Sequence, residues 1–124
     1  MPRNPKCRRV CAEPQNRLFL PQNRPLAPVV VIRVEELEAM RLCDLEGMDQ
    51  DAAANCMEVS RATFGRILAL ARQKIAKALV EGKGIDIHGG HYTVGQSCPC
   101  QKACRHCHMA PAQKASHTEI IKEE

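Results

Sequence analysis

The sequence is poor in aromatic residues: its 124 residues include no Trp, one Tyr and two Phe. Proteins that bind RNA by base stacking use several aromatic side chains, so this composition argues against such a platform. Long apolar runs are also missing, because the longest, Pro28 to Ile32, is far shorter than the roughly 18 residues of a membrane span. The first residues carry charges but no apolar stretch. We therefore expect no secretory signal, no membrane association and a cytoplasmic location.

The chain is also too short for the large enzyme folds, since barrels and full dinucleotide-binding domains need roughly 200 residues or more. It contains no recognisable catalytic acid–base pair or nucleophile constellation, so we expect that it is not an enzyme. Eight cysteines are present. In a reducing compartment, clustered cysteines more often bind metal or do redox chemistry than form disulfides, and we interpret these cysteines in that way.

Charge is distributed in blocks along the chain. Residues 1–33 carry seven basic and one acidic side chain, residues 34–59 one basic and eight acidic, and residues 60–83 six basic and one acidic. Residues 84–124 carry four of each sign, and the whole chain has a net charge of +4. Two basic blocks around an acidic one indicate a sided electrostatic field, although ordinary solvated helix faces would give a similar pattern.

The residue pattern predicts a mainly α fold of five parts. Residues 1–33 read as a basic, Pro-rich extended arm with a short strand, and residues 34–83 as a helical domain. Residues 84–97 alternate around two glycines, which predicts a β-hairpin and a linker. Residues 98–109 form a Cys-rich loop, and residues 110–124 are expected to be a disordered tail.

Three helices are predicted within residues 34–83. Gly47 ends the first, Asp49 caps the second, and Ser60 and Gly82 bound the third. Glutamates occupy the first turns of the first helix, where the helix dipole favours anions. The expected core positions are Val34, Leu37, Met40 and Leu45 in the first helix, and Phe64, Ile67, Leu68, Ala71, Ile75, Ala78 and Leu79 in the third.

A short helix, a tight turn and a longer helix with an apolar inner stripe make a helix-turn-helix, although an amphipathic helical hairpin has the same spacing. The start of the third helix combines small residues with Arg61, Thr63 and Arg66, which suits close approach to base edges in a major groove. Gly65 costs about 1 kcal/mol inside a helix, and a close neighbour such as DNA or another helix would explain it. The candidate DNA-binding residues are Arg61, Thr63, Arg66, Arg72, Gln73 and Lys77. Lys74 and the arm residues Arg3, Lys6, Arg8 and Arg9 would neutralise phosphates.

Several segments resemble a small prokaryotic family of predicted DNA-binding proteins, namely Val34–Gly47, Ser60–Leu68, Leu79–Lys83, the opening Met1–Arg3, Cys7–Val10 and Gly89-Gly90. The resemblance covers residues 1–92 and implies a helix-turn-helix similar to region four of sigma factors, with DNA as its partner. Family members often carry Ser or Thr at the position of Asp49, which here adds a negative charge near the expected phosphate path.

A dense cysteine cluster follows the helical domain. Its candidate metal ligands are Cys98, Cys100, Cys104, Cys107 and His108. The spacing fits a zinc site, an iron–sulfur cluster or metal-free redox thiols. Part of the cluster also resembles the cluster loop of radical enzymes that cleave S-adenosylmethionine, but the chain lacks their barrel. Cys7 and Cys11 are a second candidate pair, and Cys43 and Cys56 read as packing residues.

Together these features predict a sequence-specific DNA-binding protein, a transcriptional regulator whose cysteine cluster responds to metal or redox state. The alternative is a metal- or iron–sulfur-handling module whose helix-turn-helix contacts protein instead of DNA. Double-stranded DNA is the expected partner, zinc or an iron–sulfur cluster the expected cofactor, and a homodimer an alternative to a monomer.

Overall fold

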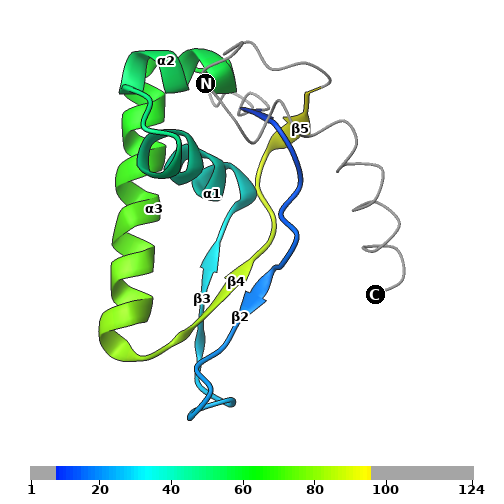
Figure 1. Ribbon diagram of the computed structural model, residues 1–124, viewed down its shortest axis with the longest axis vertical. Coiled ribbons are helices and arrows are strands. Elements are labelled where there is room, and N and C mark those ends of the chain that lie inside the picture. The colour runs from blue at the N-terminus through cyan, green and yellow to red at the C-terminus, as the bar shows by residue number, and fades with distance from the viewer. Residues whose placement is uncertain (1–7, 96–124) are drawn as a thin grey trace, which may run out of the picture.

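The computed structural model describes residues 8–95, which form three α-helices, a π-helical turn and two small sheets (Figure 1). In chain order the elements are β1 (Arg8–Val10), β2 (Leu18–Phe19), β3 (Val29–Ile32), α1 (Val34–Met40), the π-helical turn η1 (Arg41–Leu45), α2 (Gln50–Met57), α3 (Arg61–Glu81), β4 (Gly84–Ile87) and β5 (Tyr92–Val94). α2 lies across the N-terminal end of α3, and the strands β2, β3 and β4 lie beside its C-terminal half (Figure 1). This part of the chain is therefore a small domain of helices and strands, with more β-structure than the mainly α fold that we expected.

The cap residues define the helix ends as the sequence predicts. The Asp49 carboxylate accepts a hydrogen bond from the amide of Ala52 at 2.8 Å and begins α2. The Ser60 hydroxyl accepts one from the amide of Thr63 at 3.1 Å and begins α3. Gly82 ends α3 in the left-handed conformation, with a φ angle of 68°. The local chemistry of N-caps and glycine C-caps accounts for these three boundaries.

The first helix departs from the expected apolar face. Its last turn is π-helical, with the amide of Glu46 donating to the carbonyl of Arg41 at 2.9 Å. The wider turn rotates the residues that follow, so Leu45 is 57% exposed whereas Leu42 is fully buried. Val34 is buried as expected, but Leu37 and Met40 are only partly buried.

The main hydrophobic core lies between α1, α2 and the first half of α3. Of the predicted stripe of α3, Phe64, Ile67, Leu68, Ala71 and Ala78 are buried. Leu79 is 73% exposed, which corrects its expected place in the core. The last turn of α3 extends past α1 and α2 (Figure 1), and no other described element covers the side on which Leu79 lies.

The predicted β-hairpin of residues 85–94 is wrong. β4 lies between β2 and β3, antiparallel to the first and parallel to the second, whereas β5 pairs in parallel with β1. Gly89 and Gly90, with φ angles of 79° and 111°, direct the chain onward to β1 instead of reversing it. Both strands thus find partners from the first third of the chain, which a local alternation pattern does not reveal.

The basic N-terminal segment is correspondingly more than an extended arm. Its described part contributes β1, β2 and β3, and Val10 and Ile32 are fully buried in a second small core with Val34 and Ile87. Within residues 8–95, no helix is both long and apolar enough to cross a membrane.

Candidate nucleic-acid interface

The helix pair α2–α3 presents one continuous outer face at one end of the molecule. The connection Glu58–Ser60 joins the two helices, and Glu58 adopts a left-handed conformation with a φ angle of 59°. Their inner sides are buried, at Ala53 and Ala54 on α2 and at Phe64 on α3. This packing fixes α3 with its N-terminal turns directed to solvent.

The first turns of α3 bring together three of the predicted contact residues. Arg61 and Arg66 are exposed, and Thr63 is half-buried with its hydroxyl 3.0 Å from that of Ser60. Arg66 makes no ion pair or side-chain hydrogen bond with any other residue in the range 8–95. Ala62 and Ala69 are exposed beside it. This surface is therefore basic, and its small side chains leave the helix backbone close to solvent.

Gly65 lies on the same surface, in the interior of α3. A methyl group added there would meet, in the described part of the chain, only the side-chain oxygen of Gln50, at an ordinary contact distance of 3.7 Å. The neighbouring helix α2 therefore leaves room for a side chain. The sequence suggested two close neighbours that would explain a glycine here, DNA or another helix. Packing against α2 does not explain it.

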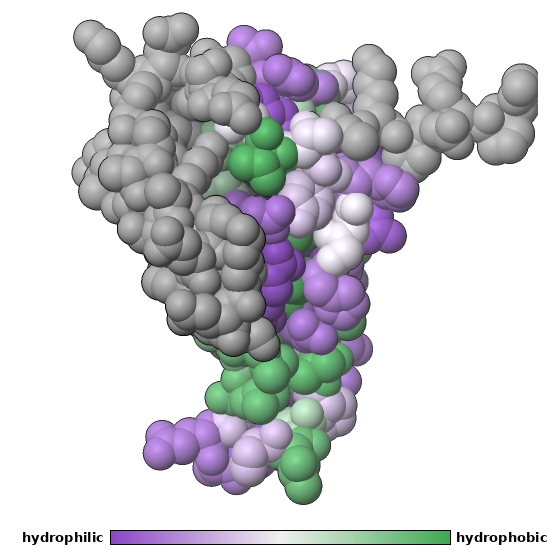
Figure 2. All heavy atoms as spheres, turned by 90° about the vertical axis from the view of Figure 1, so that its right-hand side faces the viewer, coloured by the Kyte–Doolittle hydropathy of each residue, from purple (hydrophilic) through white to green (hydrophobic). Residues whose placement is uncertain are grey.

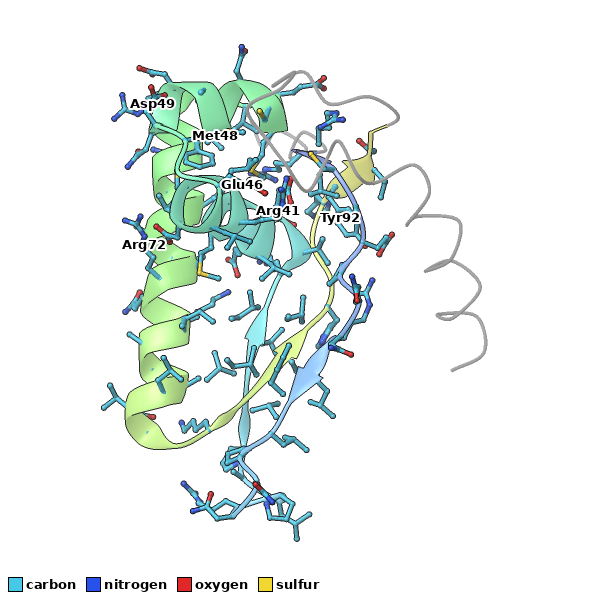
Figure 3. The ribbon with its side chains drawn as sticks, viewed as in Figure 1. Arg41, Glu46, Met48, Asp49, Arg72 and Tyr92 are labelled. Carbon is cyan, nitrogen blue, oxygen red and sulfur yellow. The ribbon has the colours of Figure 1, made fainter. Side chains whose placement is uncertain are left out.

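The other predicted basic contacts are engaged with acidic side chains. Arg61 lies 3.4 Å from Asp51, and Arg72 makes two hydrogen bonds to Asp44, at 3.2 Å and 2.7 Å. The bond to Asp44 raises the pKa of the Arg72 guanidinium above its ordinary value. Arg72 lies on the outer side of α3 in Figure 3, and Gln73 beside it in sequence is exposed.

Near the C-terminal end of the helix, Lys77 lies 3.7 Å from Glu81 and Lys83 lies 3.0 Å from the same carboxylate. The hydrogen bond from Lys83, followed by the charge of Lys77, lowers the pKa of Glu81. These two lysines thus share one acidic partner.

Buried glutamates are the feature that sequence reasoning missed. Glu35, Glu36 and Glu38 are between 2% and 5% exposed, although they read as solvated anions in the first turns of a helix. Lys74 pairs with Glu36 at 2.8 Å, so it is directed into the protein and not toward a ligand.

Arg41 organises two of the other buried carboxylates. It reaches Glu38 at 2.8 Å and Glu46 at 3.1 Å, and Arg41 and Glu46 lie next to each other in Figure 3. The one signal in the sequence was that Arg41 is the single basic residue in an acidic block, where it can pair with neighbours on its own helix.

The basic arm is only partly described. Arg3 and Lys6 lie outside residues 8–95, while Arg8 and Arg9 are in β1. Arg9 is 6% exposed and donates to the sulfur of Cys11 at 3.4 Å. Its burial corrects the prediction that Arg9 contacts phosphates, because pairing of β1 with β5 draws it inward.

The predicted metal ligands Cys98, Cys100, Cys104, Cys107 and His108 all lie outside the described residues, as does Cys7. Residues 8–95 contain no group of three or more His, Cys, Asp or Glu side chains that could hold a metal ion. Cys11 is buried and disulfide-bonded, contrary to the expectation that the cysteines stay as thiols. Cys56 is buried, as a packing residue should be, and burial raises the pKa of the half-buried Cys43 thiol.

Comparison with known proteins places this chain among uncharacterised relatives. The family model described as "Protein of unknown function DUF134" matches residues 1–95. A UPF0251 protein of Thermoanaerobacter sp. is 53% identical over 96 residues, which cover 76% of this chain and 85% of the relative. A UPF0251 protein of Caldanaerobacter subterraneus is 50% identical over 111 residues (87% and 94%), and one of Clostridium botulinum is 49% identical over 109 residues (86% and 68%). No solved structure matches the chain.

Proposed function

The chain belongs to the DUF134 family of proteins of unknown function, and we propose that it binds double-stranded DNA with α2 and α3 acting as a helix-turn-helix. In this arrangement the N-terminal turns of α3 enter the major groove. Arg61, Thr63 and Arg66 then face base edges or the nearest phosphates. Arginine suits this place because its guanidinium can donate two parallel hydrogen bonds to the edge of a guanine.

The observation that carries the proposal is the glycine at position 65, in the interior of α3. A glycine inside a helix costs about 1 kcal/mol relative to alanine, because it loses more backbone freedom on folding. The described neighbours leave room for a methyl group at this position, so the protein's own packing does not require the glycine. Gly65 lies between Ala62 and Ala69 on an exposed face, where a missing side chain lets a ligand approach the helix backbone closely.

The charge pairs of α3 are compatible with binding to phosphates. The pairs of Arg61 with Asp51 and of Arg72 with Asp44 lie on the surface, with side chains that are 46–78% exposed. Such surface pairs contribute about 0–1 kcal/mol each, so a DNA phosphate can replace the carboxylate at little cost. Lys74 differs, because the Glu36 side chain that holds it is only 3% exposed, and we exclude it from the interface.

We further propose that the DNA-binding domain is coupled to the cysteine cluster, which makes the protein a transcriptional regulator responsive to metal or redox state. This part rests on the spacing of Cys98, Cys100, Cys104 and Cys107, with His108 as a substitute ligand. Thiolates at this spacing can surround one zinc ion or hold an iron–sulfur cluster.

The direct test compares Arg66→Ala with Arg17→Ala. Both variants lose one positive charge, but Arg17 lies just before β2 and pairs with Glu13, away from α3. The probe is a pool of duplexes with randomised centres from which the unaltered protein has selected its sites. We expect Arg66→Ala to weaken binding at fixed salt by about 1–3 kcal/mol, and Arg17→Ala to leave it nearly unchanged.

Affinity of the unaltered protein must also fall steeply with salt, because bound phosphates release counterions. If it selects no duplex at low salt, DNA binding is refuted. If Arg66→Ala binds the selected sites as tightly as the unaltered protein does, the assignment of α3 to the groove is wrong.

A further inference from the structure

Cys11 is the one cysteine among residues 8–95 that is disulfide-bonded. It directly follows β1, is 4% exposed, and belongs to the main core together with Ala53 and Ala54 of α2. Cys43 and Cys56, the other cysteines within residues 8–95, are not disulfide-bonded. The second sulfur of the Cys11 bond therefore belongs to a cysteine outside this range.

Pairing of β5 with β1 brings the start of the C-terminal segment beside Cys11. The two strands are parallel, Val10 lies opposite Val94, and the amide of Gly95 donates to the carbonyl of Val10 at 2.9 Å. Continuing this register places Gly95 next to Cys11, at the spacing of about 5 Å that paired strands have. Figure 1 shows both strands at the same end of the molecule as α2. The chain therefore leaves the described domain close to the Cys11 sulfur.

The cysteines that follow Gly95 can reach this sulfur. Cys98 is three residues beyond Gly95, and an extended chain spans at most about 3.6 Å per residue, so the two are no more than about 11 Å apart. Disulfide-bonded residues have Cα atoms about 4.4–6.8 Å apart, which such a short connection permits. Cys7, by contrast, precedes Arg8, which lies about 10 Å from Cys11 at the other end of β1. The fold thus favours a partner in the C-terminal cysteine cluster, which consists of Cys98, Cys100, Cys104 and Cys107.

Arg9 and Gly95 form the surroundings of the Cys11 sulfur. Arg9 is 6% exposed, and its guanidinium donates to this sulfur at 3.4 Å. A methyl group added at Gly95 would collide with the same guanidinium, so the glycine lets Arg9 lie against the backbone where the chain leaves β5. The Glu38 carboxylate accepts from the Cys11 amide at 3.1 Å, but its charge is offset by Arg41. A positive charge beside a sulfur stabilises the thiolate, which makes Cys11 a good leaving group in thiol–disulfide exchange.

Apolar contact gives little support to the segment after Gly95. Figure 2 views the side of the molecule on which β2 and β5 lie, and the described residues visible above β2 are mainly hydrophilic. Apolar residues gather in that view at the lower end, over β2 and the loop that follows it. A covalent bond at Cys11 would hold the segment where the surface offers little apolar area.

We propose that Cys11 forms a reversible disulfide with the C-terminal cysteine cluster, and that this bond takes one thiolate away from the metal site. Disulfides of cytosolic proteins are usually transient and sense redox state, so a bond of this kind suits the reducing compartment that the sequence predicts. Oxidation closes the bond and weakens the metal site, and reduction returns the thiolate. The metal part of this inference rests on the proposed function, whereas the disulfide does not.

The reaction is a thiol–disulfide exchange with a small disulfide such as oxidised glutathione. A cluster thiolate attacks one sulfur of the oxidant and releases one glutathione thiolate, which leaves a mixed disulfide. The Cys11 thiolate then attacks the cluster sulfur of this mixed disulfide and releases the second glutathione. Two protein thiols thereby lose two electrons and two protons, and the small disulfide gains them as two thiols. In reverse, an external thiol attacks the cluster sulfur because Cys11 is buried, and Arg9 stabilises the departing Cys11 thiolate.

The bond also connects the cluster to the proposed helix-turn-helix. The Cys11 amide donates to Glu38, and Glu38 pairs with Arg41 at 2.8 Å. Arg41 also pairs with Glu46 at 3.1 Å, three residues before the Asp49 that caps α2 (Figure 3). A disulfide at Cys11 is thus joined by three side chains to the residues that begin α2.

Disulfide mapping of the full chain tests the bond directly. The protein is reduced, freed of metal with a chelator, treated with oxidised glutathione, alkylated and digested with trypsin. Trypsin places the candidate cysteines in separate peptides, with Cys11 in residues 10–17, Cys98 and Cys100 in 84–102, Cys104 in 103–105, Cys107 in 106–114 and Cys7 in 7–8. We expect mass spectrometry to find residues 10–17 linked to a cluster peptide, and chain length favours 84–102. A link to residues 7–8, or Cys11 in its alkylated form, would overturn the proposal.

Thermal unfolding of the oxidised, metal-free chain gives a second measurement. A bond from Cys11 to the cluster closes a loop of roughly 90 residues, so its reduction should lower the melting temperature by about 10 °C or more. Cys11→Ala should lose this difference. The control Cys43→Ala should keep it, because Cys43 is half-buried and not disulfide-bonded. The same difference in Cys11→Ala would contradict the proposal, and if that variant does not fold, the mapping of the unaltered chain decides.

Zinc binding tests the competition for the thiolate. Closing the disulfide should raise the dissociation constant for zinc by about tenfold or more, because the site loses a ligand. Equal zinc affinity of the reduced chain and of the mapped disulfide form would show that the competition is wrong. A chain that binds no metal in either form would instead refute the proposed metal site. The mapping and unfolding results need neither metal nor DNA, so they remain valid if the proposed function fails.

Discussion

Replacing Gly65 by alanine is expected to stabilise this protein and at the same time to weaken the binding to DNA that we propose for it. The change adds one methyl group to the interior of α3, which runs from Arg61 to Glu81. Its nearest described neighbour would be the Gln50 side chain at 3.7 Å, so no clash opposes the substitution. Alanine is favoured over glycine in a helix by about 0.5–1 kcal/mol. For a domain of this size that gain raises the melting temperature by about 2–8 °C.

The effect on DNA binding has the opposite sign. If the backbone at Gly65 lies against the DNA, a methyl group must push the helix out of the groove. We expect at least a tenfold loss of affinity, or about 1.4 kcal/mol, on duplexes selected by the unaltered protein. Thermal unfolding followed by circular dichroism measures the first effect, and fluorescence anisotropy at fixed salt measures the second.

A matched control is Ala76→Gly, which makes the reverse change on the exposed side of the same helix, about three turns away. It should destabilise the protein by about 0.5–1 kcal/mol and leave DNA affinity unchanged. Two results would refute the reasoning. If Gly65→Ala lowers the melting temperature, the glycine serves the protein's own packing. If it binds DNA as well as the unaltered protein, nothing approaches the helix closely at this point.

Two further predictions concern the turn and the cysteine cluster. Glu58→Gly should stabilise the protein by about 1 kcal/mol because Glu58 is left-handed, with a φ angle of 59°, whereas Glu58→Ala keeps that strain and should not. Thermal unfolding compares the stability of the two variants. If both are stabilised equally, the cause is the lost charge of Glu58 and not its backbone conformation. Anaerobically purified full-length protein should carry zinc or iron by elemental analysis, and Cys104→Ser should lose it, because thiolate ligands hold such centres. Absence of both metals, with no effect of Cys104→Ser, would refute the metal site.

The helix pair could be predicted from the sequence because its determinants are local. Asp49, Ser60 and Gly82 act within one turn of their own positions, and a 3.6-residue apolar period identifies the buried side of α3. The same period places Leu79 in the core, since it does not show where the covering elements end. The π-helical turn likewise breaks the period of the first helix, and no residue type marks such a turn in advance.

The sheets could not be predicted in the same way. β4 pairs with β2 and β3, and β5 with β1, so every strand pair joins segments far apart in the chain. A two-residue strand such as Leu18–Phe19 carries no pattern of its own. The burial of Glu36 likewise depends on a residue far away in the chain, because its partner Lys74 lies on another helix. Local reasoning treats each of these residues as exposed until the partner is known.

The ion pairs of the folded protein change how the charge of α3 is understood. The block 60–83 holds six basic residues and one acidic residue, which suggested a strongly basic helix. In the folded protein Lys74 is neutralised by a buried glutamate, Arg61 and Arg72 by aspartates, and Lys77 and Lys83 share Glu81. Arg66 is the basic residue of α3 that has no such partner among residues 8–95. The DNA interface that we propose therefore presents little unpaired charge, and attraction to phosphates is not its only source of affinity. In the proposed complex, phosphates that replace these carboxylates supply the salt-dependent part of the affinity, and the close contact between α3 and the groove that the missing side chain at Gly65 allows supplies the rest.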